Sequence, residues 1–188
     1  MQRFTIFTAS FLILILTSSC ASKPAEAKSG LFVNLTNKSK FFLLAPHDIE
    51  KPMDMAQQIS ASYKKYNLSI ISWVAADETK IEMSAFNEMG TTMGELLFRE
   101  GIIDLKSSVI PKVFKPEYIV ADYQLCFYKT LPLRLALEKS GLTLMINENN
   151  RRIYEKNKLI IEILKNDNSV TLINHLRGYT FAITGDFE

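Results

Sequence analysis

The chain has 188 residues, of which 47% are hydrophobic, and its 22 Lys and Arg residues nearly balance its 20 Asp and Glu residues, for a net charge of +2 at pH 7. Such a balance provides no electrostatic basis for binding nucleic acid, so we expect no nucleic-acid partner. The length and the hydrophobic content suit one domain with a substantial core.

Residues 1–19 have the layout of a secretion signal. Arg3 supplies the positive charge, residues 4–16 are almost all apolar, and the small residues 17–19 (Thr-Ser-Ser) stand at the expected cleavage point. The apolar run is shorter than the about 20 residues that a membrane-spanning helix needs. We therefore expect residues 1–19 to be removed as a signal peptide, with an uncleaved membrane anchor as the alternative.

Cys20 follows this segment directly and resembles the lipidated cysteine of bacterial lipoproteins, although Thr17 stands where those proteins usually have Leu. The resemblance implies that Cys20 carries diacylglycerol, which anchors the protein in a membrane. Ala21 after the cysteine resembles an outer-membrane address, so we expect a protein on the outer membrane that faces the periplasm. Residues 20–30 are small and polar, which predicts a flexible tether behind the lipidated cysteine.

Residues 31–188 are expected to form a single domain, and much of it alternates apolar and polar residues with a period of two, the pattern of half-buried strands. In residues 68–75, Leu68, Ile70, Ser72 and Val74 share one face, and Ser69, Ile71, Trp73 and Ala75 share the other. Turn residues such as Glu100-Gly101 separate the strands. The segments with strand character are residues 59–64, 68–75, 80–85, 92–98, 102–106, 142–146, 159–163, 170–172 and 179–183.

Between residues 116 and 141 the period changes to that of a helix. Pro116 suits a first helical turn, and one apolar stripe recurs with helical spacing at Ile119, Tyr123, Cys126 and Phe127. Thr130 is expected to cap a second helix, which has Pro132 in its first turn and ends at Gly141. Two helices therefore interrupt the series of strands.

Strands without crossover helices between them pair antiparallel, and a long antiparallel sheet curls, so that its apolar concave face must be covered. We therefore expect an α+β, mainly β, fold: a curled antiparallel sheet covered by a central pair of helices. A partly filled interior would be a pocket of the size of a lipid. The expected wall residues of this lipid-binding cavity are Trp73, Phe98, Ile119, Tyr123, Phe127 and Phe181.

The chain contains five short motifs: residues 43–46 (Leu-Leu-Ala-Pro), 121–125 (Ala-Asp-Tyr-Gln-Leu), 131–137 (Leu-Pro-Leu-Arg-Leu-Ala-Leu), 151–154 (Arg-Arg-Ile-Tyr) and 178–181 (Gly-Tyr-Thr-Phe). Together they resemble an uncharacterised bacterial lipoprotein family, domain of unknown function 3261. The chain departs from the family at residues 126–130, where members more often carry a Trp-Pro pair.

The family is similar in architecture to the lipoprotein-sorting proteins LolA and LolB. This similarity implies an unclosed antiparallel barrel with a helical lid over a hydrophobic cavity for acyl chains. Members often sit beside genes for enzymes that make aryl-polyene lipids, which implies a role in moving or anchoring such a product. The family provides no established catalytic residues.

The residues that could carry chemistry are few. His47, His175 and Cys126 do not have the spacing of a zinc site, and no phosphate-binding glycine motif is present, so we expect no metal and no cofactor. Cys126 and His175 could form a thiol–imidazole pair, but the position of Cys126 on an apolar helix stripe favours burial. Arg151 and Arg152 are expected in a solvated hairpin turn, with contact to anionic head groups as the alternative.

The leading hypothesis is a non-enzymatic, outer-membrane-anchored protein that binds an acyl or polyene lipid, or a lipoprotein, for transport or insertion. Its expected partners are the membrane, through the N-terminal lipid, and a periplasmic carrier protein. The alternative is a scaffold lipoprotein that assembles protein partners through an exposed edge strand. An esterase or thioesterase that uses Cys126 and His175 is the third possibility.

Overall fold

The computed structural model describes residues 30–108 and 115–187. The expected signal peptide, the expected lipidation site at Cys20 and the expected tether up to residue 29 lie outside the described residues. No helix within the described ranges combines the length and the apolar character needed to cross a membrane.

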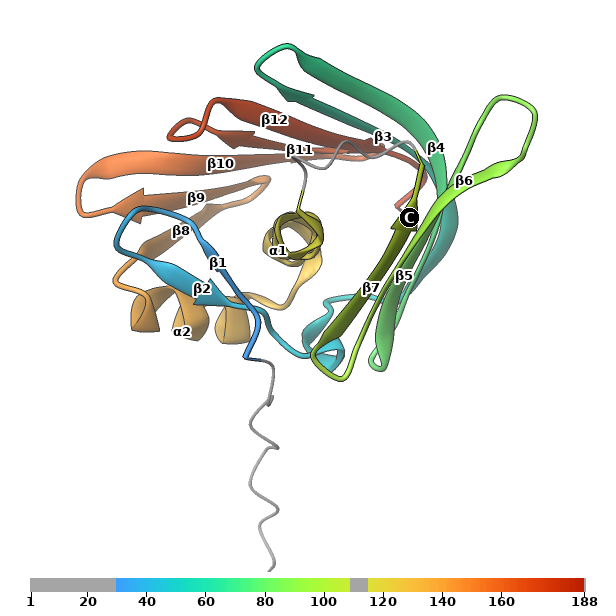
Figure 1. The fold of residues 1–188 in the computed structure, drawn as a ribbon. Helices are drawn as coiled ribbons and strands as arrows, with labels where there is room; N and C mark the ends of the chain where they lie inside the picture. The colour runs from blue at the N-terminus through green and yellow to red at the C-terminus, as the bar shows by residue number, and fades with distance from the viewer. Residues whose placement is uncertain (1–29, 109–114, 188) are drawn as a thin grey trace, which may run out of the picture.

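The fold is mainly β, as the alternating pattern predicted, and its centre is a ten-stranded sheet in which every neighbouring pair is antiparallel. The strands, in their order across the sheet, are β7 (Ile102–Ser107), β6 (Thr92–Arg99), β5 (Lys80–Phe86), β4 (Tyr66–Ala76), β3 (Met53–Tyr63), β12 (Tyr179–Thr184), β11 (Ser169–Asn174), β10 (Lys158–Asn166), β9 (Asn150–Glu155) and β8 (Thr143–Asn147). The first and last strands of the order do not pair with each other, so the sheet is curled and unclosed (Figure 1).

Tight turns join consecutive strands of each half of the sheet. Glu100 and Gly101 form the two-residue turn between β6 and β7, where Arg99 pairs with Ile102. Both turn residues have positive φ, 52° and 75°, which is the backbone that the favoured two-residue hairpin turn requires. The expected turn at these residues is confirmed.

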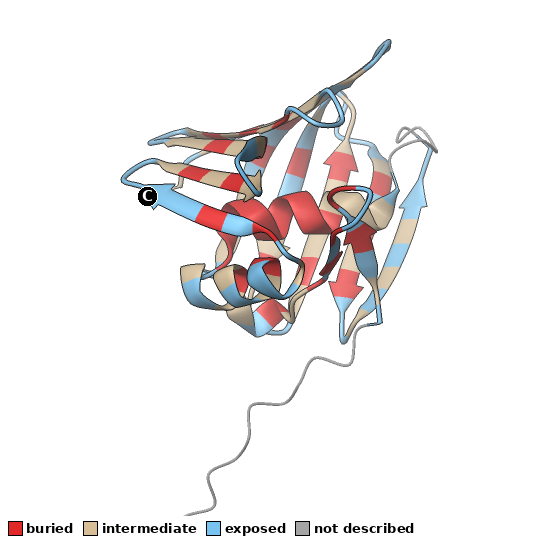
Figure 2. Ribbon diagram, turned by 90° about the vertical axis from the view of Figure 1, so that its left-hand side faces the viewer, coloured by how far each residue is buried: buried red, intermediate tan, exposed pale blue. Residues whose placement is uncertain are grey.

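The two helices have different places. Helix α1 (Pro116–Phe127) lies inside the curve of the sheet, where Figure 1 shows it end-on, and residues 120–127 are all buried. Helix α2 (Thr130–Lys139) buries Leu133 and Leu137 and packs beside β8, outside the curve. Figure 2 shows the contrast between a buried α1 and a largely exposed α2. The expected pair of helices between two sets of strands is confirmed, but of the two helices only α1 packs on the concave face of the sheet.

The start of α2 differs in detail from the expectation. Lys129, rather than Thr130, is the residue that precedes the first helical turn, and no side chain caps it. Instead, the Lys129 amide donates to the Asp48 carbonyl (2.8 Å), and the Leu133 amide donates to the Lys129 carbonyl (3.3 Å). The bond from the Lys129 amide to Asp48 ties the start of α2 to the segment before β3, and no side chain takes the place of the expected threonine cap.

A small hairpin fills one part of the concave side. Strands β1 (Phe32–Asn34) and β2 (Lys40–Phe42) form a separate two-stranded sheet, followed by a 3-10 turn at Pro46–Asp48. The hairpin buries Val33 and Phe41 and lies beside α1, on the side of β8 to β10 (Figure 1). The hairpin and α1 therefore complete the core over this half of the sheet.

Two polar side chains fix the C-terminal half of α1. The Gln124 amide bonds with both backbone groups of Leu44, accepting at 2.9 Å and donating at 2.8 Å. Arg151 of β9 donates to the carbonyls of Leu125 (3.0 Å) and Cys126 (3.2 Å), and to the Glu50 carboxylate (3.0 Å). A guanidinium at the last turn of a helix satisfies carbonyls that lack a partner within the helix. Arg151 is therefore buried, and the expectation that it lies in a solvated turn is wrong.

Replacement of Arg151 by Met should destabilise the domain, because the two α1 carbonyls would lose their donor while the side-chain volume is nearly kept. Hydrogen bonds to charged groups contribute about 1.5–3 kcal/mol each, so we expect a loss of about 3 kcal/mol in the free energy of unfolding, measured by urea denaturation. The matched control is Arg152→Met on the outer face, where Arg152 pairs with Glu162 and little change is expected. Equal effects of both substitutions would contradict this role of Arg151.

Candidate functional site

A cavity of about 270 Å³ lies on the concave face, between the first half of α1 and the strands β3 to β6 and β12. Its apolar wall includes Ile59, Ala61, Ile70, Met83, Leu96 and Phe181. The volume is just below the range of about 300–1,000 Å³ that small-molecule sites occupy. The concave side is thus partly hollow, on the half that the β1–β2 hairpin does not fill.

The alternation of the strands explains why the wall is apolar. Every second residue of two neighbouring strands lines the cavity: Ile59, Ala61 and Tyr63 on β3, and Leu68, Ile70 and Ser72 on β4. The hydroxyl of Ser72 donates to the Ser84 carbonyl at 3.0 Å, so this polar side chain already has a partner. The wall therefore presents mainly hydrocarbon to a ligand.

Gly94 contributes backbone to the wall, and packing explains why a glycine is needed there. A Cβ at this position would lie 2.5 Å from Oγ and 2.8 Å from Cβ of Ser107, its ladder partner on β7. Non-bonded atoms do not approach so closely without displacement. Gly94 therefore allows β7 to pair with β6 at this end of the cavity.

Five of the six residues expected in the wall lie on the concave side, but in different places. Ile119 of α1 and Phe181 of β12 line the cavity. Phe98, Tyr123 and Phe127 are buried in the core instead. The rings of Tyr123 and Phe127 are 4.7 Å apart, and Phe127 also stacks near Phe187 at 5.7 Å, so these aromatic side chains fill the interior next to the cavity.

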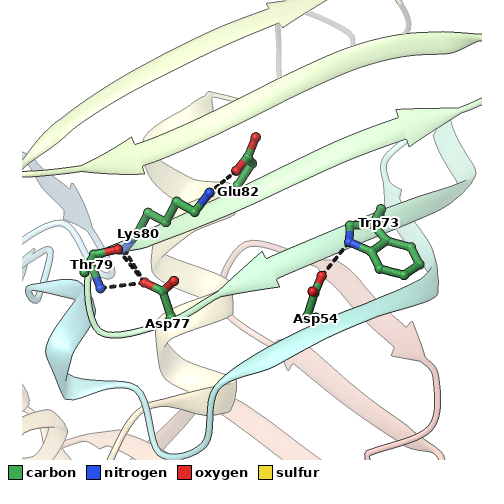
Figure 3. A network of polar contacts seen from close by, with 6 residues as sticks. All are labelled: Asp54, Trp73, Asp77, Thr79, Lys80 and Glu82. Atoms are coloured by element: carbon green, nitrogen blue, oxygen red, sulfur yellow. Dashed lines mark hydrogen bonds and ion pairs between the residues drawn. The ribbon is translucent and has the colours of Figure 1, made fainter.

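Trp73 was expected in the wall, and the structure places it on the outer face of β4. Its side chain is 47% exposed, and the indole nitrogen donates to Asp54 of β3 at 2.6 Å (Figure 3). Figure 3 shows the same outer face continuing to the β4–β5 turn, where Asp77 accepts hydrogen bonds from Thr79 and Lys80. The physical reason is the strand period, because Trp73 alternates with Ser72, which faces the cavity.

One end of the cavity is polar, and the sequence analysis did not predict it. Lys115 directly precedes α1, Tyr118 lies in its first turn and Asp122 lies near its middle. Arg177 comes from the β11–β12 connection, and Tyr179 is the first residue of β12. The Tyr179 hydroxyl donates to the Asp122 carboxyl at 2.7 Å, and the Arg177 guanidinium lies 5.3 Å from the centre of the Tyr118 ring. The sequence contained one indication of this polar end: Asp122 is an acidic residue next to the apolar stripe of the first helix.

Asp122, which is buried, and Tyr179, which is partly buried, have shifted pKa values. Burial raises the pKa of the Asp122 carboxyl from 3.8 to about 7, although the Tyr179 hydrogen bond and the nearby Arg177 charge act in the opposite direction. Burial, followed by the neighbouring Asp122 charge, raises the pKa of Tyr179 well above 10.0. The Tyr179 hydroxyl therefore stays protonated and can donate to Asp122 over the physiological pH range.

The candidate nucleophile and the histidines have other partners. Cys126 is completely buried in α1, and burial raises the pKa of its thiol well above the ordinary 9.0. His175 lies 3.6 Å from Glu162, and His47 lies 3.6 Å from Asp48. Within the described ranges, no three His, Cys, Asp or Glu side chains are grouped as metal ligands.

Replacement of Asp122 by Asn should change how stability depends on pH. Between pH 3.8 and about 7 the unfolded chain has lost the Asp122 proton while the folded protein keeps it, so the contribution of Asp122 to stability falls as the pH rises through this window. We expect Asp122→Asn to gain stability relative to the wild type from pH 4.5 to pH 7, as measured by urea denaturation. The control, Asp104→Asn at an exposed position of β7, should not show this gain. If Asp122→Asn has the same dependence of stability on pH as the wild type, the raised pKa of Asp122 is contradicted.

The comparisons with known proteins give one finding. Among curated proteins, none matches the chain. A family model described as protein of unknown function (DUF3261) matches residues 54–185, a range that contains both helices, nearly all of the large sheet and every residue of the cavity wall named above. The chain therefore belongs to the DUF3261 family.

Proposed function

We propose that this protein is a non-enzymatic lipid-binding protein that holds an acyl or polyene chain in the cavity between α1 and the curled sheet. The observation that supports the proposal is the hollow of about 270 Å³ with a mainly hydrocarbon wall. Binding of a hydrocarbon chain in such an apolar cavity has a favourable free energy, because apolar surface of both the chain and the cavity wall is removed from water.

The volume favours a single chain as the ligand. Because the cavity is smaller than most sites for drug-sized molecules, it suits one acyl or polyene chain, or one chain of a lipid or lipoprotein whose remainder stays outside. The mechanism of transfer would be differential burial, since each CH₂ group that is buried more completely contributes about 0.8 kcal/mol. A difference of a few CH₂ groups between a periplasmic carrier and this cavity would therefore set the direction of transfer.

We place the protein at the outer membrane, facing the periplasm and anchored through lipid on Cys20. The support is the sequence of residues 1–30, with its apolar segment, its small residues before Cys20 and its polar tether. Such an anchor would keep the cavity close to the membrane that receives or supplies the lipid.

The test is a bulky substitution in the cavity wall. Ala61→Phe on β3 puts a ring into the cavity, and we expect it to lower the affinity for a fluorescent fatty-acid probe at least about tenfold, equal to 1.4 kcal/mol. The control is Ala56→Phe on the exposed outer face of the same strand, which should bind like the wild type.

Native mass spectrometry of the wild type should in addition show a co-purified lipid, and Ala61→Phe should lack it. A wild-type protein that carries no lipid and does not bind the probe would refute the proposal, as would an unchanged affinity in Ala61→Phe.

The second candidate function is a scaffold for protein partners. The observation that favours it is the edge strand β7, which pairs with β6 on one side and ends the order of the described sheet. Its Ile102 is 68% exposed, and an unpaired edge can add a strand from a partner. Crosslinking from position 102 to a discrete protein, together with an absence of bound lipid, would favour this function over lipid binding.

A further inference from the structure

The polar end of the cavity carries an excess of positive charge. Three charged side chains line the cavity there, namely Lys115, Asp122 and Arg177. Glu95 also borders the cavity, but its neighbours Gly94 and Leu96 are buried while Glu95 is exposed, so strand alternation directs its carboxylate to the outer face. Asp122 is therefore the one acidic side chain that faces the two cations among the described lining residues.

Asp122 does not cancel this positive charge. Its carboxyl accepts a hydrogen bond from Tyr179 and is fully buried, and its pKa of about 7 means that a large fraction is uncharged at neutral pH. Lys115 and Arg177, by contrast, are exposed. A ligand that enters the cavity thus meets two cations at its polar end.

Neighbouring groups hold Arg177 in place. One guanidinium nitrogen donates to the Asn34 carbonyl of the β1–β2 hairpin, and the guanidinium stacks over the Tyr118 ring at 5.3 Å. The backbone amide of Arg177 donates to the Asn174 side chain at 2.8 Å. A guanidinium has five N–H donors, so donors remain for a ligand after the bond to Asn34. Because these contacts already fix the Arg177 side chain, less conformational entropy is lost when its remaining donors bind a ligand.

Lys115 is the second cation that lines the cavity. It is the residue directly before α1, and its carbonyl accepts from the amides of Tyr118 and Ile119. Tyr118, on which Arg177 stacks, is therefore one helical turn from Lys115. Two cations from separate parts of the chain, the start of α1 and the β11–β12 connection, therefore line the same apolar cavity.

We propose that this end binds an anionic head group, a carboxylate or a phosphate, of a single-chain amphiphile whose hydrocarbon occupies the cavity. Arg177 provides paired donors that match the oxygens of either group, and Lys115 adds a point charge. A cationic head group would meet like charges at the same place. This inference rests on the proposed function of the cavity and adds the chemical class of its ligand.

The experiment compares four twelve-carbon competitors against a fluorescent fatty-acid probe: dodecanoate, dodecyl phosphate, dodecanol and dodecyltrimethylammonium. The protein is produced from the full chain and held in nanodiscs of zwitterionic lipid, with empty nanodiscs as the blank. We expect the two anions to bind at least about tenfold more tightly than the alcohol, and the cation to bind most weakly. Acetate and inorganic phosphate alone should not displace the probe, which distinguishes an amphiphile from a free anion.

Two variants test the assignment to these side chains. Arg177→Gln and Lys115→Gln should each weaken both anions about tenfold and leave dodecanol unchanged, whereas Arg177→Lys should recover part of the loss. Because each variant is compared with the wild type, partitioning of the competitors into the nanodisc lipid cancels. The matched control is Lys156→Gln in the exposed β9–β10 turn, which should bind all four competitors as the wild type does.

The results distinguish failure of the head-group assignment from failure of the proposed lipid-binding function. Equal affinities for the anions and the alcohol in the wild type would overturn the head-group assignment and leave lipid binding intact. Displacement by inorganic phosphate or acetate alone would also overturn it, in favour of a free-anion site. If none of the four chains binds the wild type, both the inference and the proposed function are wrong. The order of affinities in the wild type, corrected for the partitioning of each competitor into empty nanodiscs, decides the question even if a variant fails to fold.

Discussion

The packing of α1 against the concave face of the sheet is the constraint on which the rest of the structure depends. Ten strands spaced about 4.8 Å apart make a sheet roughly 45 Å wide, whereas a helix of 12 residues is about 18 Å long and about 10 Å across. One helix of this size cannot cover such a surface, even after the sheet has curled around it. The β1–β2 hairpin covers part of the remainder, as do aromatic side chains such as Phe127 and Phe187. The cavity is the part that stays open.

The two ends of α1 serve different purposes. Its C-terminal end is fixed by Arg151 and Gln124 and surrounded by core, which gives the helix a defined position. Its N-terminal end stands over the cavity and brings Tyr118, Ile119 and Asp122 to the ligand side. The Tyr179–Asp122 hydrogen bond ties this part of α1 to β12 beside the cavity. The polar groups gathered there make the cavity chemically asymmetric, with hydrocarbon along the wall and cations at one end.

The sequence was sufficient to predict the class of fold, because strand alternation and helical spacing are local patterns. Leu68, Ile70 and Ser72 were grouped correctly on one face of β4, and they line the cavity together. Trp73 alternates with Ser72 and lies on the opposite face of β4, so its expected place in the cavity wall conflicted with the strand period. Strand period is the stronger guide, since a shift of one residue moves a side chain to the opposite face.

The polar end of the cavity could not be predicted from local patterns. Asp122 and Tyr179 are 57 positions apart in the chain, and they meet because β12 pairs with β3 and so joins the two halves of the sheet. Arg151 shows the same limitation, since its burial depends on how the end of α1 approaches β9. In both cases the sequence contains the residues but not the long-range pairing that brings them together.

The central claim is that a hydrocarbon chain occupies the space between α1 and β3 to β6. The most direct measurement is a set of nuclear Overhauser effects between carbon-13-labelled dodecanoate and the isoleucine methyl groups of β4. The chain should give cross-peaks to Ile70, which faces the cavity, and none to the adjacent Ile71, which is 53% exposed on the outer face. Cross-peaks to Ile71 without Ile70, or none to either residue with the ligand bound, would contradict the account.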